Sequence, residues 1–307
     1  MKKLSDAHSL CGSVRNSDVG HILMVLDNND DEVTPHAVSS MWSNEDQEWL
    51  RTTQNNIVYW IPVSASTCAH PLIQMITIGA WGHVLVDGKG DFHEEVIRDQ
   101  DKAPVERKGK LLRVRGIGQR AYVVGMGRQV YRRDDAHRWT PIDQGVLVPA
   151  DNMQLLGFNS IDGFSESDIY AVGLQGEIWH FDGTRWRQLD SPTNRILNDA
   201  VCAGDGQVYA CGDEGFLLRG RNDSWSIITD EAFKRDIWNL CWFADRLFIA
   251  TTQGLFFLND KGQVKPVDFG GDTPKTTYHL SARDGIMWSI GAKDIMQFDG
   301  KTWTRID

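Results

Sequence analysis

Short apolar runs recur along this chain, and each is followed by a turn and a second run in which apolar and polar residues alternate. The clearest example is DIYAVGLQGEIWHFDGTRW at residues 168–186, which recurs as VYACGDEGFLLRGRNDSW, ending at Trp225, and as IMWSIGAKDIMQFDGKTW, ending at Trp303. Weaker copies end at Trp139 and lie near 247–264 and 76–92. Period-two alternation and turns rich in Gly, Asp and Asn predict β-hairpins, most of them followed by a strand that opens with tryptophan.

The hairpins repeat at a nearly constant spacing. The residue that follows each first apolar run serves as an anchor, and the anchors are 39 to 48 residues apart: Gly79, Gly125, Gly173, Gly212, Thr251 and Gly291. This is the period of a four-stranded propeller blade. Because one such sheet cannot cover both of its faces, we expect neighbouring sheets to stack around an axis. The prediction is an all-β fold, a single β-propeller domain over 1–307, with repeat units clearest at 120–307.

The first 65 residues are interpreted as a divergent first blade. The segments HILMVL (21–26) and NIVYWIPV (56–63) are strand-like, whereas residues 43–50 are typical of a helical turn with Ser43 as its N-cap. Seven blades are favoured, and six remain an alternative. The tryptophans that open the fourth strands are expected to pack between blades: Trp139, Trp186, Trp225 and Trp303.

These repeat units resemble the broad group of WD40/YVTN/BNR-like repeat propellers. The resemblance is carried by the pattern of residues 168–186 and covers about 120–307, more weakly 70–119. It departs from two stricter patterns. The sialidase-type Asp box has the order S-x-D-x-G-x-T-W, but Gly directly follows Asp at Asp182-Gly183 and Asp299-Gly300, and no Trp-Asp dipeptide closes a blade. The resemblance implies the fold and leaves the activity open.

The sequence contains no pattern that indicates catalysis, a cofactor or a metal. Nine histidines show no metal-ligand spacing, and the acidic run at 27–32 lacks the glycine of a calcium loop. Five cysteines without a C-x-x-C pair suggest reduced thiols, and no apolar run is long enough for a membrane helix, so we expect a cytoplasmic protein without a membrane partner. A glycosidase or sialidase-like enzyme is the less favoured alternative, because no pair of carboxylates is singled out.

Charge is distributed unevenly along the chain. The net charge is −10, yet residues 98–133 contain eleven Lys and Arg against three acids. A nucleic-acid strip is disfavoured because aromatic residues are missing between 98 and 121 and the remaining chain is acidic. Two alternatives stay open: contact with a protein partner that has an acidic patch, or contact with this protein's own acidic residues.

In a propeller, the turn after each anchor lies on one common face, and rigid rings of this kind present loops to partners. The predicted partner-binding residues on this rim are Trp81, His83, Met126, Arg128, Leu174, Gln175, Asp213, Glu214, Gln253, Lys293 and Asp294. We therefore expect a non-enzymatic protein-binding propeller. The more specific hypothesis is a cytoplasmic immunity protein that neutralises a cognate bacterial toxin, in particular a basic toxin domain, since opposite charges speed association. The alternative is an assembly or scaffold factor of a multiprotein complex.

Overall fold

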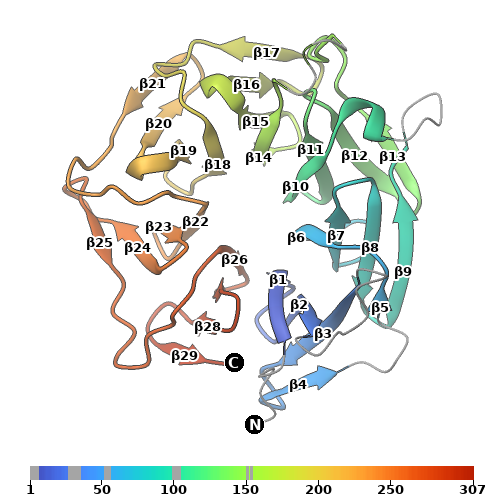
Figure 1. The fold of residues 1–307 in the computed structure, drawn as a ribbon, viewed down its shortest axis with the longest axis vertical. Coiled ribbons are helices and arrows are strands. Elements are labelled where there is room, and N and C mark those ends of the chain that lie inside the picture. Colours follow the sequence, from blue (N-terminus) through green and yellow to red (C-terminus); the bar gives the residue numbers. More distant parts are fainter. Residues whose placement is uncertain (1–6, 27–35, 52–56, 99–104, 150–151, 153–154) are drawn as a thin grey trace.

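The predicted hairpin repeats form antiparallel sheets in the computed structural model, which describes residues 7–26, 36–51, 57–98, 105–149, 152 and 155–307 (Figure 1). Within these residues there are seven sheets, arranged as blades around a central axis. Each blade has four strands hydrogen-bonded in chain order, and in blade 1 a short extra strand, β5 (Ile57–Val58), also pairs with the third strand. The prediction of a seven-bladed propeller is confirmed.

The four strand positions run from the axis outward. The first strands are β1 (Ala7–Val14), β6 (Pro62–Cys68), β10 (Leu111–Ile117), β14 (Phe158–Ser165), β18 (Leu197–Cys202), β22 (Asn239–Phe243) and β26 (His279–Arg283). The second strands are β2 (Val19–Leu26), β7 (Gln74–Gly79), β11 (Arg120–Gly125), β15 (Asp168–Gly173), β19 (Val208–Gly212), β23 (Arg246–Thr251) and β27 (Ile286–Ile290). The third strands are β3 (Ala37–Ser43), β8 (His83–Gly88), β12 (Val130–Asp135), β16 (Ile178–Phe181), β20 (Leu217–Arg221), β24 (Gly254–Leu258) and β28 (Ile295–Phe298). The fourth strands are β4 (Glu48–Arg51), β9 (Asp91–Val96), β13 (Arg138–Pro141), β17 (Trp186–Leu189), β21 (Ser224–Ile227), β25 (Val264–Pro266) and β29 (Trp303–Arg305).

The antiparallel order gives the ring two different faces. Turns between first and second strands and between third and fourth strands lie on one face, which we call the turn face. Turns between second and third strands share the other face with the segments that lead from one blade to the next, and we call this the connection face. Short 3-10 helices lie in connection-face segments, among them η1 (Val105–Lys108), η3 (Leu174–Gly176) and η4 (Asp213–Gly215).

The apolar core is divided into seven clusters, one between each pair of neighbouring blades. Between blades 3 and 4, for example, Trp186 lies against Phe158 and Phe181, and its indole N–H donates to the Ile142 carbonyl at 2.8 Å. Trp139 and Trp186 are buried, whereas Trp225 and Trp303 are half-buried at the edges of their clusters. The predicted inter-blade packing of these tryptophans is confirmed.

In the part of the chain that the structure describes, the ring closes without a shared strand, by side-chain packing and by a hydrogen bond from the Ser9 backbone N–H to the Ala292 carbonyl at 2.8 Å. Blade 1 is built from the N-terminal strands β1–β4, and blade 7 from the C-terminal strands β26–β29 (Figure 1). At this seam Trp49 lies between Trp42 and Trp288, with ring centroids 5.4 and 6.0 Å away, and donates its indole N–H to the Ile306 carbonyl at 2.8 Å. Gly20 makes room for Trp288, because a Cβ there would lie 2.1 Å from the indole ring.

The predicted helical turn at residues 43–50 is wrong. Strand β3 ends at Ser43, a turn follows, and β4 begins at Glu48. The Ser43 hydroxyl does accept a hydrogen bond from the Asp46 N–H, as an N-cap would, but the chain then reverses so that Trp49 pairs with Trp42 across the two strands.

The acidic run at 27–32 lies outside the described residues. Within the described part of the chain, no helix is long and apolar enough to cross a membrane.

We predict that Trp49→Ala destabilises the protein as much as Trp186→Ala does, by roughly 3–5 kcal/mol each, because both replace a buried aromatic side chain with a cavity. Trp225→Ala is the control and should cost less, since this side chain is half-buried. The free energy of unfolding in urea measures the three effects. A loss below about 1 kcal/mol for Trp49→Ala would contradict the role of this side chain in ring closure.

Candidate functional site

The predicted rim residues do lie on one face. Each anchor ends a second strand or directly follows one, so the residues after it lie in the connection-face turns or open the third strands. Two of these turns adopt the same shape: Gln175 and Glu214, at the centres of η3 and η4, have φ values of 59° and 55°. Seven of the eleven predicted residues are exposed: Trp81, His83, Gln175, Asp213, Glu214, Gln253 and Lys293.

Other members of the predicted set have roles inside the protein. Asp294 is buried, accepts hydrogen bonds from the backbone of Lys275 and Thr276, and forms an ion pair with Arg305 at 2.8 Å. It is therefore not presented to a partner. Arg128 is half-buried, since its guanidinium lies 5.0 Å from the Trp179 ring and pairs with Glu177 at 2.7 Å. Met126 and Leu174 are also half-buried.

The connection face also presents apolar side chains that the repeat analysis did not find. Large apolar residues are exposed in the segments that lead from one blade to the next: Tyr59, Ile61, Leu147, Leu155, Ile196 and Trp238. Tyr59 is 67% exposed, and Trp238 and Trp81 are each 45% exposed. Among the described residues, Leu72 is the one exposed large apolar side chain in a turn-face loop. The connection face is therefore the apolar face of the ring.

One part of this face combines apolar and acidic groups. Trp238 precedes the first strand of blade 6, and its backbone N–H donates to the Ala250 carbonyl at 3.0 Å. Next to it, Asn198 donates to the Asp213 carboxylate at 2.9 Å and to the Ile237 carbonyl at 3.1 Å. The Asp236 carboxylate accepts the Glu214 N–H at 2.9 Å. We call Ile196, Asp213, Glu214, Asp236 and Trp238 the blade 5–6 patch.

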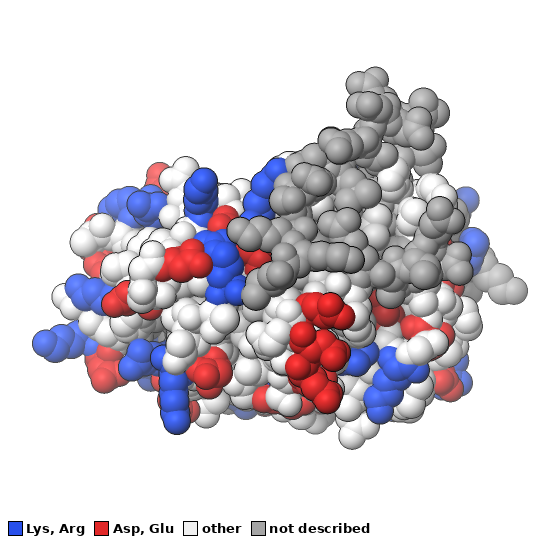
Figure 2. All heavy atoms as spheres, turned by 90° about the horizontal axis from the view of Figure 1, so that it is seen from below, with Lys and Arg blue, Asp and Glu red and all other residues white. Residues whose placement is uncertain are grey.

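The basic segment at 98–133 is largely neutralised within the protein. Most of its described arginines and one lysine form ion pairs with acidic residues, in the pairs Lys108–Asp143, Arg113–Asp199, Arg115–Asp162, Arg115–Asp199, Arg120–Glu166, Arg128–Glu177, Arg132–Asp134 and Arg133–Glu95. This agrees with the self-contact alternative. Seen from the side in Figure 2, acidic and basic side chains are interspersed over the described surface.

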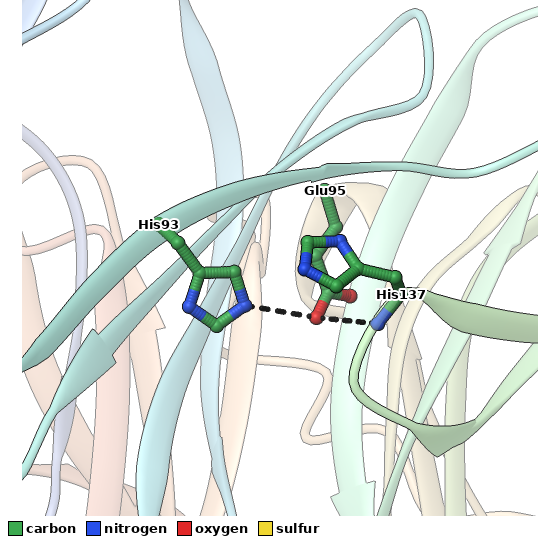
Figure 3. Close-up of side chains that lie close together, drawn as sticks. All are labelled: His93, Glu95 and His137. Carbon is green, nitrogen blue, oxygen red and sulfur yellow. Dashed lines mark hydrogen bonds and ion pairs between the residues drawn. The ribbon is translucent and has the colours of Figure 1, made fainter.

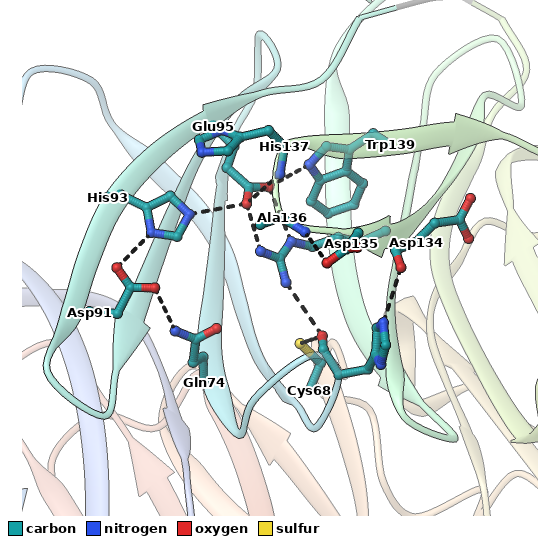
Figure 4. Close-up of polar contacts among 12 residues, drawn as sticks. Cys68, Gln74, Asp91, His93, Glu95, Asp134, Asp135, Ala136, His137 and Trp139 are labelled. Atoms are coloured by element: carbon teal, nitrogen blue, oxygen red, sulfur yellow. Dashed lines mark hydrogen bonds and ion pairs between the residues drawn. The ribbon is translucent and has the colours of Figure 1, made fainter.

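His93, Glu95 and His137 are a candidate metal cluster, since one ligand atom of each lies within 4.8 Å of the others (Figure 3). Glu95 already has partners for both oxygens (Figure 4). Oε1 accepts from Arg133 at 2.6 Å and from the His137 backbone N–H at 3.0 Å, and Oε2 accepts from the Trp139 indole at 2.8 Å and from Arg133 at 3.1 Å. These donors belong to blade 3, whereas Glu95 belongs to β9 of blade 2. Glu95 is therefore the centre of a network of an ion pair and hydrogen bonds that links blades 2 and 3.

The surroundings of Glu95 favour its charged form. Burial by itself raises the pKa of this carboxyl group, but the hydrogen bonds from Arg133 and from the His137 N–H outweigh burial and lower the pKa from 4.5 to about 2. Because the pKa in the folded protein lies below the unfolded value, the charged carboxylate stabilises the fold above about pH 4.5. This stabilisation is lost as the pH falls toward 2.

We predict that the free energy of unfolding of the wild type falls by on the order of 3 kcal/mol more than that of Glu95→Gln between pH 6 and pH 2, as expected for a pKa lowered by this amount. At pH 6 the variant should already be less stable by roughly 3–5 kcal/mol, because Arg133 is left buried without its carboxylate. Urea unfolding at a series of pH values measures both effects, with Glu45→Gln in an exposed turn as control. Parallel pH profiles for wild type and Glu95→Gln would contradict the assignment.

The fold has many relatives among solved structures. The chain is similar to YCF48 bound to a D1 peptide (15% identity, TM-score 0.68, covering 97% of this chain and 93% of that one). It is also similar to the WD40 propeller domain of Doa1 (10% identity, TM-score 0.65, 98% and 93% covered) and to a streptogramin B lyase (11% identity, TM-score 0.62, 80% and 82% covered). These likenesses show the fold alone, and no family model matches the sequence.

A full-length relative gives a more specific result. The immune protein Tsi7 of Pseudomonas aeruginosa is 43% identical to this chain over 309 aligned residues, and the alignment covers 100% of both proteins. The similarity therefore extends over the full length of both chains. The chain described here belongs to the family of the immune protein Tsi7.

Proposed function

We propose that this chain is an immunity protein that neutralises a protein toxin by binding it, without catalysis, and that it contacts the toxin through its connection face. Two observations support the proposal. A relative of the same length is an immune protein. The connection face is also where exposed aromatic and apolar side chains gather, and such patches on a soluble protein mark interaction sites.

The blade 5–6 patch is the part of this face that we propose as the centre of the interface. Tryptophan is among the residue types that contribute most to binding when a partner covers them, and Trp238 is partly exposed. The patch also contains three carboxylates, of which Asp213 and Glu214 are exposed and Glu214 lies 3.4 Å from the Arg195 guanidinium. The patch fits a partner surface on which basic side chains surround an apolar centre. We therefore propose a basic toxin domain as the partner.

We also propose that this protein acts in the cytoplasm. All five cysteines are free, and four of them are buried: Cys11, Cys68, Cys211 and Cys241. Burial raises the pKa of the Cys11 and Cys241 thiols to about 12, which keeps them in the unreactive thiol form. Reduced, buried thiols are usual in a reducing compartment.

Co-expression with the product of the neighbouring gene tests the proposed function. If the neighbour is a toxin, growth should stop when it is expressed alone and should be restored when this chain is expressed with it, and the two proteins should purify as a complex. A neighbour that is harmless and assembles with this chain into a larger complex would favour a scaffold role instead.

We predict that Trp238→Ala weakens toxin binding by at least tenfold, because truncation of an aromatic anchor at the centre of an interface commonly costs about 2 kcal/mol or more. The free energy of unfolding should fall by less than it does for the buried Trp186, since 45% of Trp238 is exposed. Leu72→Ala is the matched control, an exposed apolar side chain in a turn-face loop. Calorimetric titration gives the affinities. Equal affinities for wild type and Trp238→Ala, with weaker binding by Leu72→Ala, would move the interface to the turn face.

We also predict that the double substitution Asp213→Asn and Glu214→Gln slows association with a basic toxin by roughly three- to tenfold at low salt, and that the difference shrinks as salt is added. The control removes two exposed carboxylates from the turn face, with Asp245→Asn and Asp260→Asn. Association rates of the wild type and of both double variants, measured at two salt concentrations, show which pair of carboxylates attracts the toxin. If the wild-type rate does not depend on salt, the toxin is not recognised by charge.

A further inference from the structure

The central axis of the ring contains a polar cup that the proposed toxin-binding surface does not use. The cup has a volume of about 260 Å³, and the first strands of all seven blades contribute to its wall. Its lining residues come mostly from the C-terminal halves of these strands, so the cup lies toward the turn face. Toward the connection face the axis narrows to a cavity of about 20 Å³ beside Arg113, Asn239 and His279.

One cationic side chain in the wall is fixed in place by the protein. Arg115 donates to the Ile161 carbonyl at 3.3 Å, and to the Ala200 carbonyl and the Asp199 carboxylate at 3.3 and 3.4 Å. Asp199 is itself buried and accepts further hydrogen bonds from Ser160, Asn239 and the Leu240 N–H, at 2.5 to 2.8 Å. Arg115 is therefore held with its guanidinium group beside the cup.

A second cation in the wall has no comparable partner. Arg283 is the last residue of β26, and its guanidinium forms no hydrogen bond with any described residue. Its Nε atom is shielded from solvent and unpaired, and the contact with the Asp284 carboxylate is long, at 4.0 Å. A guanidinium group carries five N–H donors, and the Nε–H of Arg283 is the one that is shielded from solvent without an acceptor, which is costly.

The neutral groups of the wall do not supply these acceptors. The hydroxyl oxygen of Ser281 accepts the Val14 N–H at 3.0 Å and lies 3.2 Å from the Ser13 hydroxyl. Ser13 and Thr67 are in turn hydrogen-bonded to one another at 2.9 Å. Asp162, the carboxylate of the wall, accepts the Cys202 N–H at 2.8 Å and lies 3.8 Å from Arg115. The cup therefore offers to a ligand a guanidinium group that has no hydrogen-bond partner among the described residues.

From this arrangement we propose that the cup is a binding site for a small oxyanion, a carboxylate or a phosphate, which Arg283 binds directly. Planar guanidinium groups bind both kinds of anion through paired hydrogen bonds. The site lies toward the opposite face from the proposed toxin interface, so it is independent of that proposal and can fail or succeed without it.

Calorimetric titration with inorganic phosphate and, separately, with acetate tests the proposal, at constant ionic strength in chloride. We expect saturable binding at one site for the wild type by at least one anion, and the anion that binds tells whether the site takes a phosphate or a carboxylate. Arg283→Gln should weaken this binding by at least tenfold. Arg185→Gln is the matched control, because this arginine lies in a turn-face loop with 82% of its side chain exposed, and it should bind as the wild type does.

Absence of saturable binding by both anions would overturn the proposal, and so would equal affinities for wild type and Arg283→Gln. If Arg283→Gln does not fold, the intact protein provides a second readout. In nitrogen-15 spectra of the wild type, the anion should shift one or two arginine Nε–H signals in a saturable manner. Arg283→Lys assigns the signal of Arg283 by its loss. Titration without any shift of that signal would overturn the proposal as well.

Discussion

Face-to-face packing between neighbouring sheets is the interaction on which the whole molecule depends. Both faces of every blade carry apolar side chains, and each face is covered by the next blade around the ring. A single blade could not bury these faces, so no blade is expected to be stable without its neighbours. The ring must therefore close. At the other junctions a chain segment links the two neighbouring blades, but blades 7 and 1 are held together by packing across their interface.

The repeat architecture could be predicted because it depends on local signals. Alternating apolar positions, Asp-Gly turns and the tryptophan that opens the fourth strand all lie within one blade length. The first blade lacks those signals, and there the pattern at 43–50 predicted a helical turn where the structure has a strand connection. The strand connection is explained by the pairing of Trp42 with Trp49 and by the contact of Trp49 with Trp288, which lies 239 residues further along the chain.

The candidate site could be predicted only in part, for a related reason. Topology places the turns after the anchors on one face, so exposed residues such as Asp213 and Glu214 were found from the repeat alone. Trp238 and Ile196 lie in blade connections, where no alternation indicates which way a side chain points. The ion pairs of the basic segment could not be predicted either, because Arg115 and Asp199 are 84 residues apart in sequence and come together only when the ring has formed. An apolar residue just before a first strand is the signal that would have found the missed positions.

Ring closure without a shared strand has a consequence for how such a protein can change during evolution. In the described residues each blade is built from consecutive strands of the chain, so duplication or deletion of a single stretch of coding sequence adds or removes a whole blade. Some propellers assemble one blade from strands of both chain termini. In these, a duplication or deletion must leave that composite blade intact. Here the new terminal blades would have to present matching apolar faces and to re-form the hydrogen bonds across the seam. The blade count in this architecture is therefore open to change by simple tandem duplication.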